Sequence, residues 1–340
     1  MAQPVGIALI GLGAKWGKQL ATAVARTDST RLVTCYARTP ETRQKFATEF
    51  GCQAAPTLEA AITAPGVQAA IIAAPAHVHL EATLACAQHG VHVLVEKPIA
   101  LHLHEARQMQ EACQQANVVL MVNHEMRRLG SNRAVKRVVA EGQLGQVLTA
   151  VASQTLPGTF SPDNWRCHRE TNRGGALMQL GIHQIDTLMY LLGPVVEVQG
   201  FLRHGAAPVD IDDVCTVHLT FESGATAVVT SNYISPKVYA LHLYGDRANL
   251  SCVADMLVWP DALKVDANTS LVLQTHQGHS TLVIEPQDCL SLQLDEFARC
   301  VRGEAQPETG AAEGMAALAV VEAALRSSEH RIPVDPRVLS

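Results

Sequence analysis

The segment VGIALIGLGAKWG, residues 5–17, decides the fold that we expect. Six mostly apolar residues form a strand pattern, glycines follow at Gly11, Gly13 and Gly17, and helical spacing begins directly afterwards. In a dinucleotide-binding fold the first glycine makes the tight turn, the second lets the backbone approach the pyrophosphate, and the third allows close packing of helix and sheet. The unpaired N–H groups at the start of the helix then face the phosphates.

The spacing of the glycines departs from GxGxxG, because Trp16 stands at the third glycine position and Gly17 comes one residue late. A simple strand–turn–helix cluster of glycines is therefore the alternative interpretation. The loop residues that we expect to bind the cofactor are Gly11, Gly13, Ala14, Lys15 and Trp16.

Outside this segment, the first third of the chain alternates apolar runs with helical stretches, which is typical of a parallel sheet covered on both faces. The expected strands are 5–10, 31–36, 68–73, 91–95 and 118–122, and the expected helices are 14–25, 40–50, 77–88 and 105–116. The pattern then changes to helices over 131–141, within 173–192, over 291–301 and over 314–327, with mostly strand-like sequence from 195 to 284.

These patterns predict an α/β protein with two domains. Residues 1–122 would form a dinucleotide-binding domain with a Rossmann-type, doubly wound parallel sheet. Residues 123–340 would form an α+β domain with a large, mostly antiparallel sheet that binds substrate and mediates oligomerisation.

The composition of the 340 residues excludes several classes of protein. Hydrophobic residues make up 48% and charged residues 17%, which is incompatible with a disordered chain. The net charge is −6 without a block of like charge, so we expect no nucleic-acid and no membrane partner. The nine cysteines form no CxxC pair, no run of about 18 apolar residues is present, and we expect no secretory signal. We therefore expect a soluble cytoplasmic protein with free thiols.

The end of the second expected strand indicates the type of cofactor. NAD-preferring sites usually place a carboxylate there for the ribose hydroxyls. This chain instead has Ala37, Arg38 and Thr39. The guanidinium of Arg38 could bind a 2′-phosphate in a bidentate manner, so the sequence favours NADP(H), with NAD(H) as the second choice. An ordinary solvated arginine is the alternative interpretation of Arg38.

Two further segments carry groups suited to proton transfer. Lys97 follows the expected strand 91–95, at the edge where parallel sheets hold their ligands. A lysine beside a cationic nicotinamide has a lowered pKa and can exchange a proton with a substrate hydroxyl. Gln179 and His183 are four residues apart and therefore neighbours on one helical face, and Asp186 could orient the His183 ring or serve the helix. A surface lysine and a buried structural histidine are the alternatives.

Several motifs in this order resemble the glucose–fructose oxidoreductase, inositol dehydrogenase and rhizopine-catabolism family (Gfo/Idh/MocA). They are Glu96-Lys97-Pro98, the loop 74–79 with sequence APAHVH, and the segment 174–186 with sequence GGALMQLGIHQID. The closing helix over 310–325 is also similar, so the resemblance covers nearly the whole chain. The resemblance implies a sugar or cyclitol oxidoreductase and a cis Lys97–Pro98 bond.

The resemblance also implies roles for particular residues. Lys97 would relay the proton beside the nicotinamide, and His183 would bind the reacting oxygen. The family usually has aspartate where Gln179 stands, which restricts Gln179 to hydrogen bonding. Further cofactor contacts would come from Ala74, Pro75, His79 and Glu96, and substrate contacts from Trp165, Arg166 and His168. Arg127, which follows the last expected strand of the first domain, could also bind substrate, and structural surface roles are the alternative for these residues.

The predicted function is hydride transfer between nicotinamide and a carbinol or carbonyl carbon of a sugar, sugar derivative or cyclitol. The alternatives are a dihydrodiol dehydrogenase acting on a cis-diol, glycoside cleavage with tightly held cofactor, and a non-catalytic NADP-sensing regulator. Relatives are often oligomers, so we expect a homodimer or homotetramer formed through the sheet of the second domain. The two HxH pairs, at 77–79 and 102–104, lack an obvious third and fourth ligand, so we expect no metal.

Overall fold

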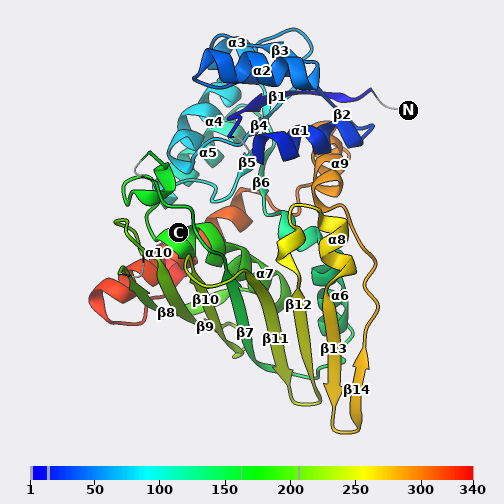
Figure 1. The fold of residues 1–340 in the computed structure, drawn as a ribbon, viewed down its shortest axis with the longest axis vertical. Coiled ribbons are helices and arrows are strands. Elements are labelled where there is room, and N and C mark those ends of the chain that lie inside the picture. Colours follow the sequence, from blue (N-terminus) through cyan, green and yellow to red (C-terminus); the bar gives the residue numbers. More distant parts are fainter. Residues whose placement is uncertain (1–2, 14–15, 162, 206, 340) are drawn as a thin grey trace. The chain divides into compact units, whose positions relative to one another are not determined.

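The computed structural model describes residues 3–13, 16–161, 163–205 and 207–339, and these form two compact units (Figure 1). The first unit comprises the residues up to His124 together with Leu290–Met315, and the second comprises Glu125–Cys289 and the residues from Ala316 onward. The expected division into 1–122 and 123–340 places its boundary close to the first of these transitions. It differs in assigning 290–315 to the second domain.

The edge strand of the first sheet explains why residues 290–315 group with the first unit. Val122 donates its N–H to the carbonyl oxygen of Thr309 at 2.7 Å, and the Thr309 hydroxyl returns a bond of 2.7 Å to the Val122 carbonyl. The side-chain amide of Gln293 donates to the same carbonyl at 3.1 Å. The chain near the C-terminus thus satisfies backbone groups that an edge strand would otherwise expose.

The first unit contains a six-stranded parallel sheet with the order β3-β2-β1-β4-β5-β6. Its strands are β1 (Val5–Ile10), β2 (Thr30–Tyr36), β3 (Gln53–Ala54), β4 (Ala69–Ile72), β5 (His92–Glu96) and β6 (Leu120–Asn123). Its helices are α1 (Trp16–Arg26), α2 (Pro40–Phe50), α3 (Leu58–Ile62), α4 (His79–Gln88), α5 (Leu103–Gln115) and α9 (Cys289–Val301). This confirms the doubly wound Rossmann-type sheet.

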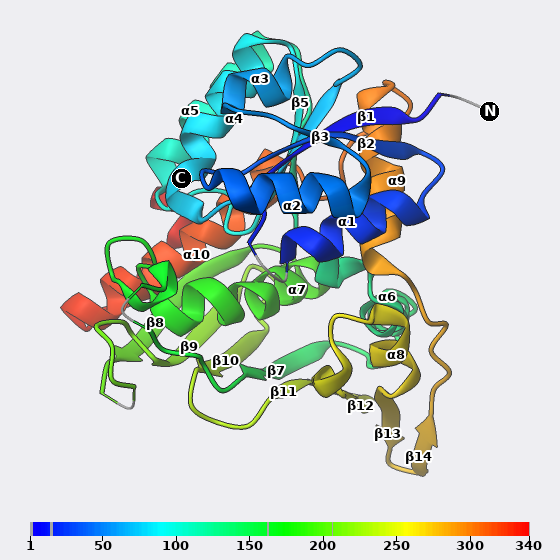
Figure 2. The same ribbon diagram turned by 45° about the horizontal axis from the view of Figure 1, so that its top comes forward.

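Both faces of this sheet are covered. Every residue of β1, β4 and β6 is buried, which is why these strands are mostly apolar, with Asn123 of β6 as the polar exception, rather than alternating. Helices α1 and α2 both pack against β2, and α4 packs against α3 and α5 (Figure 2). The sequence patterns did not predict β3 and α3, because two and five residues are too few to show a period.

The second unit contains an eight-stranded, mostly antiparallel sheet with the order β14-β13-β12-β11-β7-β10-β9-β8, as expected. Its strands are β7 (Val147–Thr155), β8 (Val195–Arg203), β9 (Val214–Phe221), β10 (Thr226–Asn232), β11 (Val238–Gly245), β12 (Ala248–Ala254), β13 (Ser270–Thr275) and β14 (Gly278–Thr281). Its helices are α6 (Gly130–Ala140), α7 (Ile182–Leu192), α8 (Ala262–Ala267) and most of α10 (Ala311–His330). Strands β7 and β10 form the one parallel pair among these neighbours.

The two faces of this sheet differ. Ala152 in β7 and its partner Leu241 in β11 are buried on the face against which α6 and α7 pack (Figure 2). Val151 and its partner Val228 in β10 lie on the opposite face and are partly exposed, and Phe201 in β8 on that face is 59% exposed. We call this second surface the open face of the sheet.

Candidate active site

The glycine turn of the first unit has the shape of a dinucleotide cradle. Gly11 has φ +89°, and a Cβ added to it would lie 2.4 Å from the backbone nitrogen of Ala74. Among the described residues, none has an atom within 4 Å of a Cβ added to Gly13, so the backbone there borders open space. The loop therefore combines a tight turn at Gly11 with accessible backbone at Gly13, as pyrophosphate binding requires.

The glycine displaced from the usual spacing performs the packing role of the third glycine. A Cβ on Gly17 would lie 2.9 Å from the Cα of Leu12, so α1 can approach the loop this closely only with glycine at that position. The Gly17 N–H also donates to the Gly13 carbonyl at 3.1 Å and closes the first turn of the helix. Ala14 and Lys15, which we expect to bind the cofactor, lie outside the described residues.

Trp16, in the position that glycine usually occupies, connects the loop to the segment with the candidate lysine. Its indole N–H donates to Oε1 of Glu96 at 2.5 Å, and the Asn123 amide donates to the same oxygen. Burial raises the pKa of Glu96, whereas these two hydrogen bonds and the charge of Lys97 oppose that rise. The ends of β5 and β6 and the start of α1 are thereby joined through one buried carboxyl group. Lys97 follows directly and is partly exposed, and its bond to Pro98 is cis.

The end of β2 presents a cation and no carboxylate. Arg38 and Thr39 are exposed, and Arg43 braces the turn by donating to the carbonyl oxygens of Ala37 at 3.1 Å and of Arg38 at 3.4 Å. Burial lowers the pKa of His77 in the loop after β4, and the positive charge of Arg38 lowers it further. Arg38 and the loop after β4 are therefore close enough to interact electrostatically.

His79 has a structural environment. It is 1% exposed, its Nδ1 lies 3.0 Å from the carbonyl oxygen of Pro98, and its Nε2 lies 2.9 Å from that of Ala74. The ring thus connects the loop after β4, which contains Pro75, to the loop after β5. No group of three or more His, Cys, Asp or Glu side chains in the described part of the chain could hold a metal ion.

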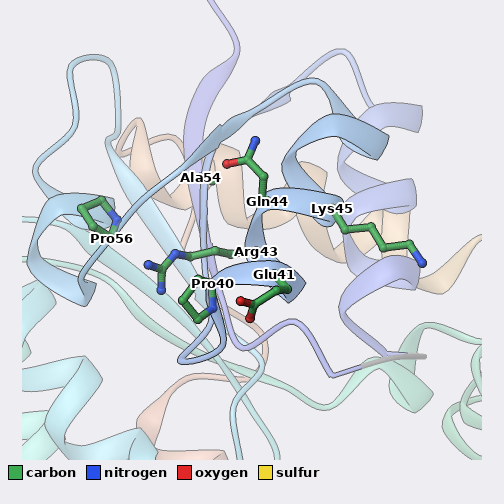
Figure 3. A pocket seen from close by; sticks show the side chains of 7 residues that line it. All are labelled: Pro40, Glu41, Arg43, Gln44, Lys45, Ala54 and Pro56. Carbon is green, nitrogen blue, oxygen red and sulfur yellow. The ribbon is translucent and has the colours of Figure 1, made fainter.

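A surface hollow of about 580 Å³ lies beside α2, and its lining begins directly after Thr39 in the sequence. Figure 3 shows the end of the Arg43 side chain between Pro40 and Pro56, with Glu41 nearby. None of the residues that we expect to contact cofactor or substrate lines it. We therefore assign the candidate site to the strand ends and not to this hollow.

In the second unit, Gln179 and His183 lie on a helical segment that begins with a π turn. The π turn spans Leu177–Gly181 and continues directly into α7. Single π turns inside helices often occur at functional sites. Gln179 is 8% exposed and His183 is 6% exposed, so both side chains are largely buried.

Two asparagines were not predicted from the sequence, namely Asn123 and Asn172. Asn172 accepts a hydrogen bond of 3.2 Å from the Gln179 amide and donates one of 2.8 Å to the Arg166 carbonyl. Neither asparagine belongs to a recognisable motif, although Asn172 lies two residues before Gly174 and Asn123 directly follows the expected strand 118–122. Proximity to these segments was the one available signal.

Tyr233, directly after β10, is a third residue that the sequence did not indicate. It is 7% exposed, and burial raises its pKa, whereas the charge of Arg166 and the Asn172 amide lower it. Arg166 itself is exposed and lies over the ring of Trp165 at 4.4 Å. The second unit thus brings Trp165, Arg166, Asn172 and Tyr233 into one neighbourhood. His168 is also exposed there.

Arg127 and Asp186 form a buried, bidentate ion pair. The guanidinium donates to the two carboxylate oxygens at 2.8 and 2.7 Å, and the residues are 7% and 1% exposed. Asp186 is thus the ion-pair partner of Arg127, and the sequence did not predict this pair. Arg127 was expected to contact substrate, and in the structure its guanidinium is held by α7.

The parallel sheet with its glycine turn defines a Rossmann-type dinucleotide-binding protein. Residues 5–124 match the model of an oxidoreductase family with an NAD-binding Rossmann fold, and residues 132–251 match the GFO/IDH/MocA C-terminal domain. The chain belongs to the Gfo/Idh/MocA family and is an oxidoreductase.

Two curated relatives and one solved structure illustrate the similarity. A 1,5-anhydro-D-fructose reductase from Ensifer adhaerens is 26% identical over 91% of this chain and 96% of its own. A 2,7-anhydro-N-acetylneuraminate hydratase from Mediterraneibacter gnavus is 30% identical over 77% and 70%. A protein from Desulfitobacterium hafniense, assigned as an NADPH-dependent oxidoreductase, has a TM-score of 0.96 at 33% identity over 100% and 99%.

Proposed function

We propose that this protein is an NADP(H)-preferring dehydrogenase or reductase that interconverts a carbinol and a carbonyl group in a sugar, sugar derivative or cyclitol. The glycine turn is the main observation in support of dinucleotide binding. Among the described residues Gly13 borders open space, and Gly17 lets α1 pack against Leu12. The relative from Ensifer adhaerens, a sugar-derivative reductase, supports the substrate class.

The cofactor preference is supported by the end of β2. Arg38 is exposed at the position where NAD-preferring sites usually have a carboxylate, so a 2′-phosphate would meet a cation instead of a negative charge. Thr39 adjoins it, and Ala74, Pro75 and Trp16 would border the same dinucleotide. His79 would contribute indirectly, by holding the loop after β4 in place. NAD(H) remains the second cofactor to test.

When bound, the nicotinamide supplies the carbon that accepts or donates hydride. Lys97 would hold or release the hydroxyl proton at Nζ, and Glu96 fixes the backbone from which Lys97 extends. The imidazole of His183 would hydrogen-bond the reacting oxygen, and Gln179 would bind the substrate without exchanging a proton, because an amide does not titrate. Trp165 and Arg166 would contact the rest of the substrate, and Arg127 would position α7.

The test is a panel of sugars, anhydrosugars and cyclitols, with turnover followed by the absorbance of reduced nicotinamide for both cofactors. We expect turnover of at least one member with NADP⁺ that falls by about 10³-fold or more in Lys97→Ala, since general acid–base groups contribute about 10²–10⁴-fold. Binding of NADPH without turnover of any substrate would contradict the proposal and favour a regulator. Turnover of cis-dihydrodiols alone would favour the dihydrodiol dehydrogenase.

A further inference from the structure

The orientation of the Gln179 side chain is fixed by a chain of hydrogen bonds that begins at the backbone. The Arg166 carbonyl can only accept, so the side-chain group of Asn172 that faces it at 2.8 Å must be the NH₂ group. The carbonyl oxygen of the Asn172 amide therefore points the other way, toward Gln179. That oxygen also can only accept, so Gln179 must present its own NH₂ group at 3.2 Å.

Reversing either amide would be costly. If Gln179 alone were reversed, two carbonyl oxygens would face each other across the same 3.2 Å. If both amides were reversed, the Asn172 oxygen would face the Arg166 carbonyl, which has no hydrogen to donate. Asn172 is 1% exposed and Gln179 is 8% exposed, so water would compensate poorly for such a contact.

The backbone of Asn172 is held as firmly as its side chain. Its N–H donates to the His168 carbonyl at 2.9 Å, and its carbonyl accepts from Gly175 at 3.1 Å. Gly175 has φ +46°, and a Cβ there would lie 2.0 Å from the backbone oxygen of Asp212, so only glycine fits. Asn172 is therefore a rigid anchor for Gln179.

We infer that Asn172 is a positioning residue that makes Gln179 present a carbonyl oxygen, and not an N–H group, on the side turned away from Asn172. That oxygen is a neutral hydrogen-bond acceptor, which suits a hydroxyl group of an uncharged polyol and disfavours a carboxylate or phosphate at the same place. This inference rests on the proposed function for its substrate and on the hydrogen-bond chain for its geometry. It gives the residue that replaces the family's aspartate a defined role.

The test is a double-mutant cycle with the polyol that gives the highest turnover. We expect Asn172→Leu and Gln179→Met each to lower kcat/KM by about tenfold, mainly through KM, as loss of one hydrogen bond would. If Asn172 acts through Gln179, the double variant will be no worse than Gln179→Met alone. If the two single-variant losses of kcat/KM multiply in the double variant, Asn172 has a general structural role and the inference is wrong. Asn268→Leu, at an exposed asparagine of the same unit, is the matched control.

A second variant covers the case in which Asn172→Leu fails to fold. Asn172→Asp keeps the size of the side chain and the oxygen that accepts the hydrogen bond from Gln179. It loses the N–H group that donates to the Arg166 carbonyl, and it regains a donor only when its carboxyl group is protonated. We expect its kcat/KM, relative to the wild type, to recover as the pH falls. A ratio that stays constant with pH would contradict the inference.

A measurement without substrate separates this inference from the proposed function. With ¹⁵N-labelled glutamine, the side-chain N–H signals of Gln179 are identified by their loss in Gln179→Glu. We expect their hydrogen exchange to accelerate by about tenfold in Asn172→Leu, which removes the acceptor, and to be unchanged in Asn268→Leu. Unchanged exchange in Asn172→Leu would refute the anchor even if the enzyme is active. Loss of turnover on every polyol, with the exchange result obtained, would refute only the proposed function.

Discussion

At the scale of single residues, one displaced glycine and one unexpected tryptophan have clear physical reasons. Gly17 is needed because α1 passes within van der Waals distance of Leu12, and this requirement depends on the path of the backbone rather than on a count from Gly11. Trp16 fills the usual glycine position and binds the buried Glu96 carboxyl group. A departure from a motif can therefore preserve the motif's physical role.

The exposed guanidinium of Arg38 predicts the cofactor preference of this chain. Arg38→Ala should weaken NADPH binding by about tenfold to a hundredfold, because a charge-assisted bidentate contact would be lost, while NADH binding changes little. Quenching of protein fluorescence on titration with each cofactor measures both affinities. Arg26→Ala, another exposed arginine of this unit, serves as control. Equal weakening for both cofactors would mean that Arg38 does not contact the 2′-phosphate.

His92 predicts a defined dependence of stability on pH. Burial lowers its pKa, and its Nδ1 accepts a hydrogen bond of 3.0 Å from the Val119 N–H, which only the unprotonated nitrogen can do. As the pH falls, the His92 ring therefore takes up a proton at a higher pH in the unfolded chain than in the folded chain. The free energy of unfolding consequently decreases as the pH falls below about 6.5.

In His92→Asn the Oδ1 atom can accept the same bond without titrating. Chemical denaturation between pH 7 and pH 5 should show a shallower loss of unfolding free energy for His92→Asn than for the wild type. The difference in slope cannot exceed about 1.4 kcal/mol per pH unit, the limit for one proton. Parallel curves would show that His92 contributes nothing to acid sensitivity.

At the scale of elements, the turn between β1 and α1 separates two kinds of glycine requirement. Gly11 is constrained by its positive φ and by the adjacent Ala74 backbone, whereas a methyl group at Gly13 would enter open space. The sequence pattern marks both residues equally. Only the tertiary structure distinguishes the crowded backbone at Gly11 from the open space beside Gly13.

This distinction gives a paired prediction. Gly13→Ala should leave the melting temperature within a few degrees of the wild-type value and weaken dinucleotide binding by about tenfold or more, because the methyl group would occupy the cradle. Gly11→Ala should instead destabilise the first unit, because the backbone must shift to remove the clash. Thermal melts and cofactor titration of both variants distinguish the two effects. A Gly13→Ala protein with unchanged affinity would place the dinucleotide elsewhere.

At the scale of the whole molecule, the feature that needs an explanation is the open face of the large sheet. Val151 and Val228 are paired on it, and both are partly exposed between β-branched and polar neighbours. Exposed apolar surface of this kind often marks a contact with another protein chain. The homodimer or homotetramer predicted from the sequence would bury this face. Within the described residues, every helix is too short or too polar to span a bilayer.

Val151→Glu should convert the oligomer to monomer, because a carboxylate buried between two sheets would lack a partner. Sedimentation velocity measures the change, and circular dichroism checks that the sheet is intact. Leu263→Glu, at a 46% exposed leucine on α8, is the control. If wild-type protein sediments as a monomer at micromolar concentration, or if Val151→Glu remains oligomeric, the open face is not the interface.

The sequence by itself determined the two sheets, the glycine turn and the position of Lys97 after β5. These features follow from local periodicity and short-range spacing, which a linear chain carries directly. Only the tertiary structure decided which residues support them: Glu96 with Trp16 and Asn123, Asn172 with Gln179, and Asp186 with Arg127. Most of these pairs are distant in sequence, and their energies depend on burial and hydrogen-bond geometry that no spacing records. The association of residues 290–315 with the first unit has the same cause, because the backbone groups of β6 are satisfied by chain that lies far away in the sequence.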